Sequence, residues 1–116
     1  MSGSPFETAL DGLTRQRGVT AALVAEERDG IVIDARVHIG QRADRVAALA
    51  ASLYRKARLS AQAAGLGDVG FLQLEAEEGR VCAAGRGDVV MIAVTTPDAN
   101  IGLIRVELLR ALEAIE

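Results

Sequence analysis

Residues Val89–Val94 read Val-Val-Met-Ile-Ala-Val, an apolar run in which no polar side chain alternates. A strand with one face in water alternates, so an unbroken run of this length is typical of a strand that is buried on both faces. We therefore expect this strand in the middle of a sheet that carries helices on both sides. The tripeptide Arg86-Gly87-Asp88 just before it spells an adhesion motif, but between two strands it predicts a hairpin turn.

The segments on either side of this strand predict a sequence of further helices and strands. Short hairpin connections between neighbouring strands require a mainly antiparallel sheet. The predicted order is α-β-β-α-β-β-β-α, which is an α/β (α+β) class. The expected elements are a helix from about residue 6, strands at 19–26 and from 31, a helix at 43–64, strands at about 69–76, 80–85 and 89–95, and a last helix after Asn100.

The long helix predicted at 43–64 has two faces that are not simply charged. One face is an apolar stripe at helical spacing and is expected to cover the core. The other face carries small residues and a leucine, which suits close approach of another surface, although an ordinary alanine-rich helix would read the same way. The first face is Val46, Leu49, Ala50, Leu53, Ala57 and Ala64; the second is Ala48, Ser52, Arg55, Leu59 and Gln62, with Tyr54 flanking it.

Length and composition limit the possible classes of protein. The chain has 116 residues and 12.2 kDa, which predicts one domain over 1–116. A net charge of -3 and only 3% aromatic residues argue against nucleic-acid binding. No apolar run approaches the roughly 20 residues that span a bilayer. One cysteine and a start without signal-peptide character predict a cytoplasmic protein.

The residues that could carry chemistry each have a plainer structural interpretation. Gly65–Gly70 matches the letters of a dinucleotide fingerprint, but here a helix precedes and a strand follows, so a helix stop is expected. His38 and Cys82 have no partner at a catalytic or metal-binding spacing. The glutamates around the turn at 75–78 are expected to be solvated. We therefore expect no catalytic site, no metal and no cofactor.

The ordered combination of several stretches resembles the roadblock/dynein light chain family, and within it the bacterial MglB-like proteins. The matching stretches are 17–24 leading to Asp29-Gly30, the alanine-rich helix after Ala43, Gly67-Asp68, and 100–105 at the start of the last helix. The resemblance implies a three-layer sandwich with a five-stranded sheet of order 2-1-5-4-3. Helices one and three would cover one face and helix two the other. The charged approach Glu26–Gly30 departs from the pattern of the family at this hairpin.

The resemblance also implies a function. The family forms homodimers, or heterodimers with a paralogous roadblock protein, through helix two and strand three. It acts as scaffold and regulator of small Ras-like GTPases, and bacterial members stimulate GTP hydrolysis without donating an arginine. A non-enzymatic dimeric regulator is therefore the first hypothesis, and neither nucleic acid nor membrane is expected as a partner.

Two sets of residues are candidates for these contacts. Strand three is an edge in the inferred order, and residues 69–74 lack the lysine, proline or inward charge that protects an edge. The predicted dimer interface is Ala47, Tyr54, Arg58, Phe71, Leu72 and Gln73. The predicted partner-binding surface is Ala48, Ser52, Arg55 and Leu59.

A small-molecule sensor or an adaptor of profilin-like layout is the alternative hypothesis. Compact helix-on-sheet domains often bind ligands, and a sensor needs a cavity lined by large side chains with a few polar anchors. Two phenylalanines, one tyrosine and no tryptophan supply such a cavity poorly. An enzyme is the third hypothesis, and the motifs disfavour it.

Overall fold

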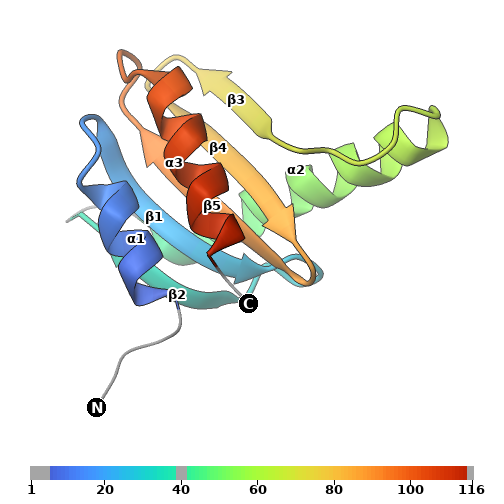
Figure 1. Ribbon diagram of the computed structural model, residues 1–116, viewed down its shortest axis with the longest axis horizontal. Coiled ribbons are helices and arrows are strands. Elements are labelled where there is room, and N and C mark those ends of the chain that lie inside the picture. Colours follow the sequence, from blue (N-terminus) through green and yellow to red (C-terminus); the bar gives the residue numbers. More distant parts are fainter. Residues whose placement is uncertain (1–5, 39–41, 115–116) are drawn as a thin grey trace.

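A computed structural model describes residues 6–38 and 42–114 of the chain. The three helices and five strands follow the predicted order (Figure 1). They are α1 (Glu7–Thr14), β1 (Val19–Glu26), β2 (Val32–Val37), α2 (Ala43–Ala63), β3 (Leu72–Ala76), β4 (Gly79–Arg86), β5 (Val89–Thr95) and α3 (Ile101–Glu113).

The five strands form one antiparallel sheet of order β2-β1-β5-β4-β3. Helices α1 and α3 lie on one face and α2 on the other, and the C-terminal end of α2 extends past the sheet (Figure 1). The α+β class, the strand order and the three layers are therefore confirmed. Strand β3 begins at Leu72, three residues later than expected.

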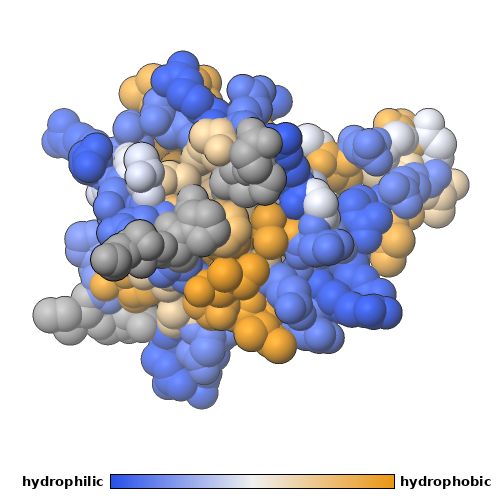
Figure 2. Space-filling view, turned by 60° about the horizontal axis from the view of Figure 1, so that its bottom comes forward, coloured by the Kyte–Doolittle hydropathy of each residue, from blue (hydrophilic) through white to orange (hydrophobic). Residues whose placement is uncertain are grey.

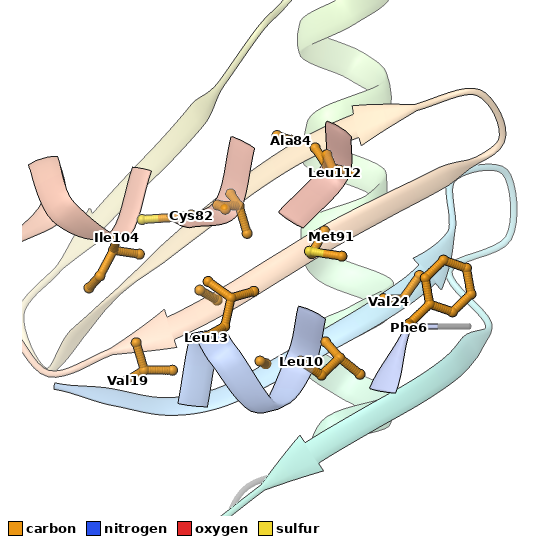
Figure 3. Packing of buried hydrophobic residues seen from close by; sticks show 13 residues of the cluster. Phe6, Leu10, Leu13, Val19, Val24, Cys82, Ala84, Met91, Ile104 and Leu112 are labelled. Atoms are coloured by element: carbon orange, nitrogen blue, oxygen red, sulfur yellow. The ribbon is translucent and has the colours of Figure 1, made fainter. Parts of the chain in front are cut away.

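The central strand β5 is buried on both faces, as its unbroken apolar sequence predicts. Met91 and Ala93 belong to the core beneath α1 and α3, whereas Val90 and Ile92 belong to the core beneath α2. Figure 3 shows the first of these cores, where Leu10 and Leu13 of α1 and Ile104 and Leu112 of α3 pack over the face of the sheet that carries Met91.

The turn predictions are also confirmed. Gly65 follows the end of α2 with φ +77°, and the backbone N–H of Leu66 donates to the carbonyl of Ala61 at 2.8 Å, so the glycines end the helix. Gly87 turns the chain between β4 and β5 with φ +61°. The guanidinium of Arg86 donates to the carbonyls of Leu112 and Glu113 at 2.9 and 3.1 Å, so it caps the C-terminus of α3.

The rotation of α2 about its own axis corrects one prediction. The predicted core stripe of α2 is only partly right. Ala50 is buried and Val46 packs partly buried against the core, but Leu49 is 51% exposed, so the helix is rotated from the predicted orientation. Small side chains let a helix approach a sheet closely, and here three alanines and one tyrosine make that contact. The buried residues of α2 are Ala47, Ala50, Ala51 and Tyr54.

Candidate protein-interaction site

A cleft of about 320 Å³ lies between the outer face of α2 and the β1–β2 hairpin. Helical spacing places its α2 residues on one side of the helix, and all of them are exposed. The structure brings all four predicted partner-binding residues into this cleft. Its lining is Ala48, Ser52, Arg55, Lys56 and Leu59 from α2, with Glu27, Arg28, Asp29 and Gly30 from the hairpin.

Gly30 sets the closeness of the hairpin to α2. It adopts φ +71°, and a Cβ built on it would lie 2.8 Å from the Cα of Ala48. Its backbone N–H donates to the carbonyl of Glu26 at 2.9 Å, which closes the turn. Only glycine combines this conformation with this approach, so the Asp29-Gly30 pair gives the cleft its floor.

An ion pair fixes the other end of the hairpin to α2. The guanidinium of Arg58 donates to both carboxylate oxygens of Glu27, each at 2.8 Å, and the Glu27 side chain is only 15% exposed. This hydrogen bonding is the main reason that the pKa of Arg58 is raised. A bidentate pair fixes orientation as well as distance, so the charged hairpin that departs from the expected pattern is held in a defined place.

A second unpartnered surface lies on the neighbouring side of α2, next to β3, and Lys56 lines both this surface and the cleft. Strand β3 is an edge of the sheet and its side chains are mostly exposed. A shallow apolar hollow of about 280 Å³ connects it to α2. Its lining is Leu53, Lys56, Ala57 and Ser60 of α2 with Leu72, Gln73 and Leu74 of β3.

The other sheet edge, β2, differs from β3 because its backbone is partly satisfied by its own side chains. The N–H of His38 donates to Thr20, so in the antiparallel ladder Ala35 points its N–H away from β1. That N–H donates to the Asp34 carboxylate at 2.8 Å, and Arg36 holds the same carboxylate at 3.1 Å. A register shift beside Val24 adds a bulge, so this edge is protected in two ways.

Exposed apolar side chains nevertheless lie along β2. Ile31 and Ile33 are among the exposed large hydrophobic residues, together with Val37. Figure 2 brings this side of the molecule forward and shows an apolar patch bordered by hydrophilic residues.

Comparison with known proteins identifies the family of the chain. The profile of the Roadblock/LC7 domain matches residues 5–96, which is most of the sequence. The chain belongs to the Roadblock/LC7 family. The uncharacterized protein MJ1340 of Methanocaldococcus jannaschii is 28% identical over 111 residues, which is 96% of each chain.

Solved structures share the fold of this Roadblock/LC7 chain at lower identity. A Roadblock/LC7 domain from Streptomyces avermitilis superposes with a TM-score of 0.83 at 21% identity, covering 93% of this chain and 92% of that one. The gliding protein MglB from Thermus thermophilus gives 0.80 at 20% identity, with 99% and 90% covered. Myxococcus xanthus MglB gives 0.84 at 16% identity, with 98% and 94% covered.

The predicted dimer residues of this Roadblock/LC7 chain do not all lie at one surface. Tyr54 is 3% exposed and Ala47 is fully buried, so the expectation that Tyr54 flanks an exposed face is wrong. Arg58 is occupied by Glu27. Phe71 packs against the core beneath α1 and α3, with the Arg105 guanidinium 5.2 Å from its ring centre.

Leu72 and Gln73 do lie at the β3 edge, where further residues join them. The sequence predicts Leu53 and Ala57 on the core face of α2, but in the structure they line the hollow beside β3, as does Leu74. The signal that could find them is the apolar stripe itself, since an apolar stripe beside an open strand edge is a candidate surface for contact with another protein.

The remaining candidate residues lie apart from the cleft in this Roadblock/LC7 chain. Cys82 is buried in the core beneath α1 and α3, and this burial raises the pKa of its thiol, which disfavours the thiolate. His38 is exposed at the end of β2. Within residues 6–38 and 42–114 no group of three or more His, Cys, Asp or Glu side chains could hold a metal ion, and none of the described helices is both long and apolar enough to cross a bilayer.

Proposed function

We propose that this Roadblock/LC7 chain is a self-associating scaffold, a single domain without a catalytic site, that binds a small Ras-like GTPase and regulates its GTP hydrolysis. The self-association is with a second copy or with a paralogous Roadblock/LC7 chain. The family is generally non-catalytic. The proposal places the protein in the cytoplasm, where such a partner GTPase works.

The observation that carries the proposal is the contrast between the two edges of the sheet. Asp34 satisfies the outward N–H of Ala35 on β2, whereas Leu72 to Leu74 on β3 have no such cover among the described residues. An unprotected edge pairs readily with another strand. A twofold axis beside β3 would make that pairing self-complementary and continue the sheet into the second copy.

The apolar stripe of α2 supports the same arrangement. Leu53 and Ala57 flank the hollow beside β3, and Leu49 is half exposed on the same stripe. Pairing of two β3 strands brings the two α2 helices together along these residues, which removes apolar surface from water. Ala47 and Tyr54 would support this contact indirectly, because they pack α2 against the sheet of its own chain.

The partner GTPase is assigned to the cleft between α2 and the β1–β2 hairpin. Ala48 and Ser52 are small enough to let another backbone approach, and Arg55 is an exposed cation that can bind a carboxylate. This cleft adjoins the hollow beside β3 at Lys56, whereas Ala48, Ser52, Arg55 and Leu59 line the cleft alone.

The relatives support association but do not identify the partner. One MglB structure, with a TM-score of 0.81 to this chain, is described as having a tetrameric arrangement. The sensor alternative has less support, since the cleft of about 590 Å³ between α3 and the chain before β1 is lined largely by small and polar residues. They are Gln16, Arg17, Gly18, Thr96, Asp98, Ala99 and Asn100, with Leu103 and Ile104.

Two measurements test the proposal. Sedimentation equilibrium at tens of micromolar should give a dimer mass, and a monomer would reject self-association with a second copy. Calorimetric titration with a Ras-like GTPase from the same genome should show binding that Arg55→Glu weakens at least about tenfold. Arg15→Glu, an exposed charge at the end of α1, should leave the affinity unchanged.

A further inference from the structure

We infer that the cleft between α2 and the β1–β2 hairpin selects an acidic segment of its partner, one that carries an aliphatic or aromatic side chain between its carboxylates. This inference relies on the proposed function only for the class of partner that carries the segment. The chemistry of the segment follows from the floor, the rim and the far side of the hairpin.

The floor of the cleft is shaped for one inserted side chain. Gly30 and Ala48 touch across it, and neither extends a side chain that could fill the space. Leu59, which is 46% exposed, supplies an apolar wall. Burying a side chain against such a surface contributes most of the free energy at the centre of a protein interface.

The rim of the cleft carries unpaired positive charge. Arg28, Arg55 and Lys56 line it, and none of the three has an ion pair or a side-chain hydrogen bond with any described residue. The whole chain has a net charge of -3, so this local surplus runs against its overall charge. Unpaired cations around an apolar floor attract carboxylates and repel basic segments.

The two acids of the lining do not cancel this charge. Both oxygens of Glu27 accept hydrogen bonds from Arg58, which neutralises that carboxylate internally. Asp29 is the one acid of the lining without such a partner, against three unpaired cations.

The opposite side of the hairpin has the reverse character. A separate hollow there is lined by four acids, Glu26, Glu27, Asp29 and Asp88, and by Arg28, and it shares Glu27, Arg28 and Asp29 with the cleft. With Glu27 held by Arg58, three acids face one cation in this hollow, whereas three cations face one acid in the cleft. The balance of charge therefore reverses across the hairpin. An acidic segment is favoured in the cleft and disfavoured beyond the hairpin.

A display selection tests the chemistry without knowledge of the partner. Random dodecapeptides displayed on phage are selected against the immobilised full chain, and the recovered peptides are measured by fluorescence anisotropy. We expect recovered sequences with aspartate or glutamate on both sides of a leucine or phenylalanine. Their affinity should fall steadily as salt rises, because exposed charges are screened.

Paired variants assign the binding to the cleft. The double change Arg28→Glu with Arg55→Glu should weaken the acidic peptides at least about tenfold, and Ser52→Phe should weaken them by filling the cleft. The matched control, Arg15→Glu with Arg110→Glu, removes the same charge from the α1 and α3 side and should bind as the wild type does. Thermal unfolding of each variant checks that the fold is retained.

The outcomes separate this inference from the proposed function. Recovered peptides without acidic residues, acidic peptides that bind the Arg28 and Arg55 double variant normally, or no recovered peptides at all would overturn the inference. If acidic peptides bind in the cleft while Ras-like GTPases do not bind the chain, the preference of the cleft for acidic segments is confirmed and the proposed GTPase partner is wrong. If a GTPase binds and is insensitive to the cleft variants, it docks elsewhere and the inference is wrong.

Discussion

The ring of Tyr54 on α2 lies against the backbone of Gly85 on β4, so closely that a Cβ built on Gly85 would stand 2.5 Å from its Cε2 atom. The hydroxyl of the same ring donates to the carbonyl of Val69 at 2.8 Å. One side chain therefore connects α2, the end of β4 and the segment that leads into β3. It holds in place the helix and the strand edge that we assign to self-association.

Gly85→Ala should lower the free energy of unfolding by about 1–3 kcal/mol, because the added methyl group overlaps the Tyr54 ring. Chemical denaturation of the wild type and the variant measures the change. Two other glycines have nothing within 4 Å of a built Cβ and serve as controls. Gly70→Ala should change little, and Gly12→Ala inside α1 should stabilise by roughly 0.5–1 kcal/mol.

Tyr54→Phe should cost about 1 kcal/mol, because the carbonyl of Val69 loses a donor while the ring stays in its packing. The same denaturation experiment measures it. Hydrogen exchange should locate the effect in the segment just before β3. If the variant is as stable as the wild type and exchange in that segment is unchanged, the hydrogen bond does not stabilise the fold.

Glu27 and Arg58 should be energetically coupled, because each is the other's bidentate partner and the Glu27 side chain is largely buried. A double-mutant cycle with Glu27→Gln and Arg58→Met measures the coupling from four unfolding free energies. We expect a coupling larger than that of an exposed pair. Arg110 and Glu107, whose Arg110 side chain is 71% exposed, form the comparison pair and should couple more weakly.

The parts of the fold that the sequence alone predicted are those where one residue pattern has one structural solution. An unbroken apolar run at Val89–Val94 suits only a strand covered on both faces, and glycine after a helix suits only a stop. The strand order is different, because antiparallel hairpins can be arranged in several ways. That order was expected only from the resemblance to a family.

The rotation of α2 could not be predicted from the strength of its apolar residues. Leu49 and Leu53 are more hydrophobic than the alanines at 47, 50 and 51, yet the alanines are buried against the sheet, and Val46 is only partly buried there. The reason is the short distance between α2 and the backbone beneath it. Gly30 lies against Ala48 and Gly85 lies against the Tyr54 ring, so closely that a Cβ on either glycine would overlap them. The sequence pattern shows which residues of the helix are hydrophobic, but it does not show how closely the helix approaches the sheet.

The sequence predicted one part of the candidate site and missed the other. The four partner-binding candidates share one side of α2 and therefore stay together under any rotation, and they line one cleft. The contribution of the hairpin was not predicted, because Glu27 and Gly30 meet α2 only through contacts between residues distant in the sequence.

Asp34→Ala should make the protein assemble beyond the dimer. The change exposes the outward N–H of Ala35, and Ile31, Ile33 and Val37 already present apolar surface along that edge. An edge without protection pairs with other strands. Sedimentation velocity at increasing concentration should show species larger than those of the wild type.

Asp34→Asn is the matched control for this prediction. Its amide oxygen can still accept from Ala35, so it removes the charge and keeps the cap. We expect it to sediment as the wild type does. If both variants associate equally, charge and not the hydrogen bond protects the edge.

Leu74→Lys should convert the dimer to a monomer without unfolding it. Leu74 is 38% exposed on β3 and lines the hollow that Leu53 and Ala57 share, so in the single chain a lysine there can reach water. In a β3-paired dimer its charge would be held between two copies, where removal from water is costly. Lysine on an edge strand is also a residue that natural sheets use to prevent pairing.

Leu103→Lys on α3 is the matched control, since Leu103 is 58% exposed and lies on the other face of the sheet. Sedimentation equilibrium should give a monomer for Leu74→Lys and a dimer for Leu103→Lys, with thermal unfolding midpoints measured for both. A Leu74→Lys protein that stays dimeric would move the self-association away from β3, and the α2 stripe would then have to form the contact without a continuous sheet.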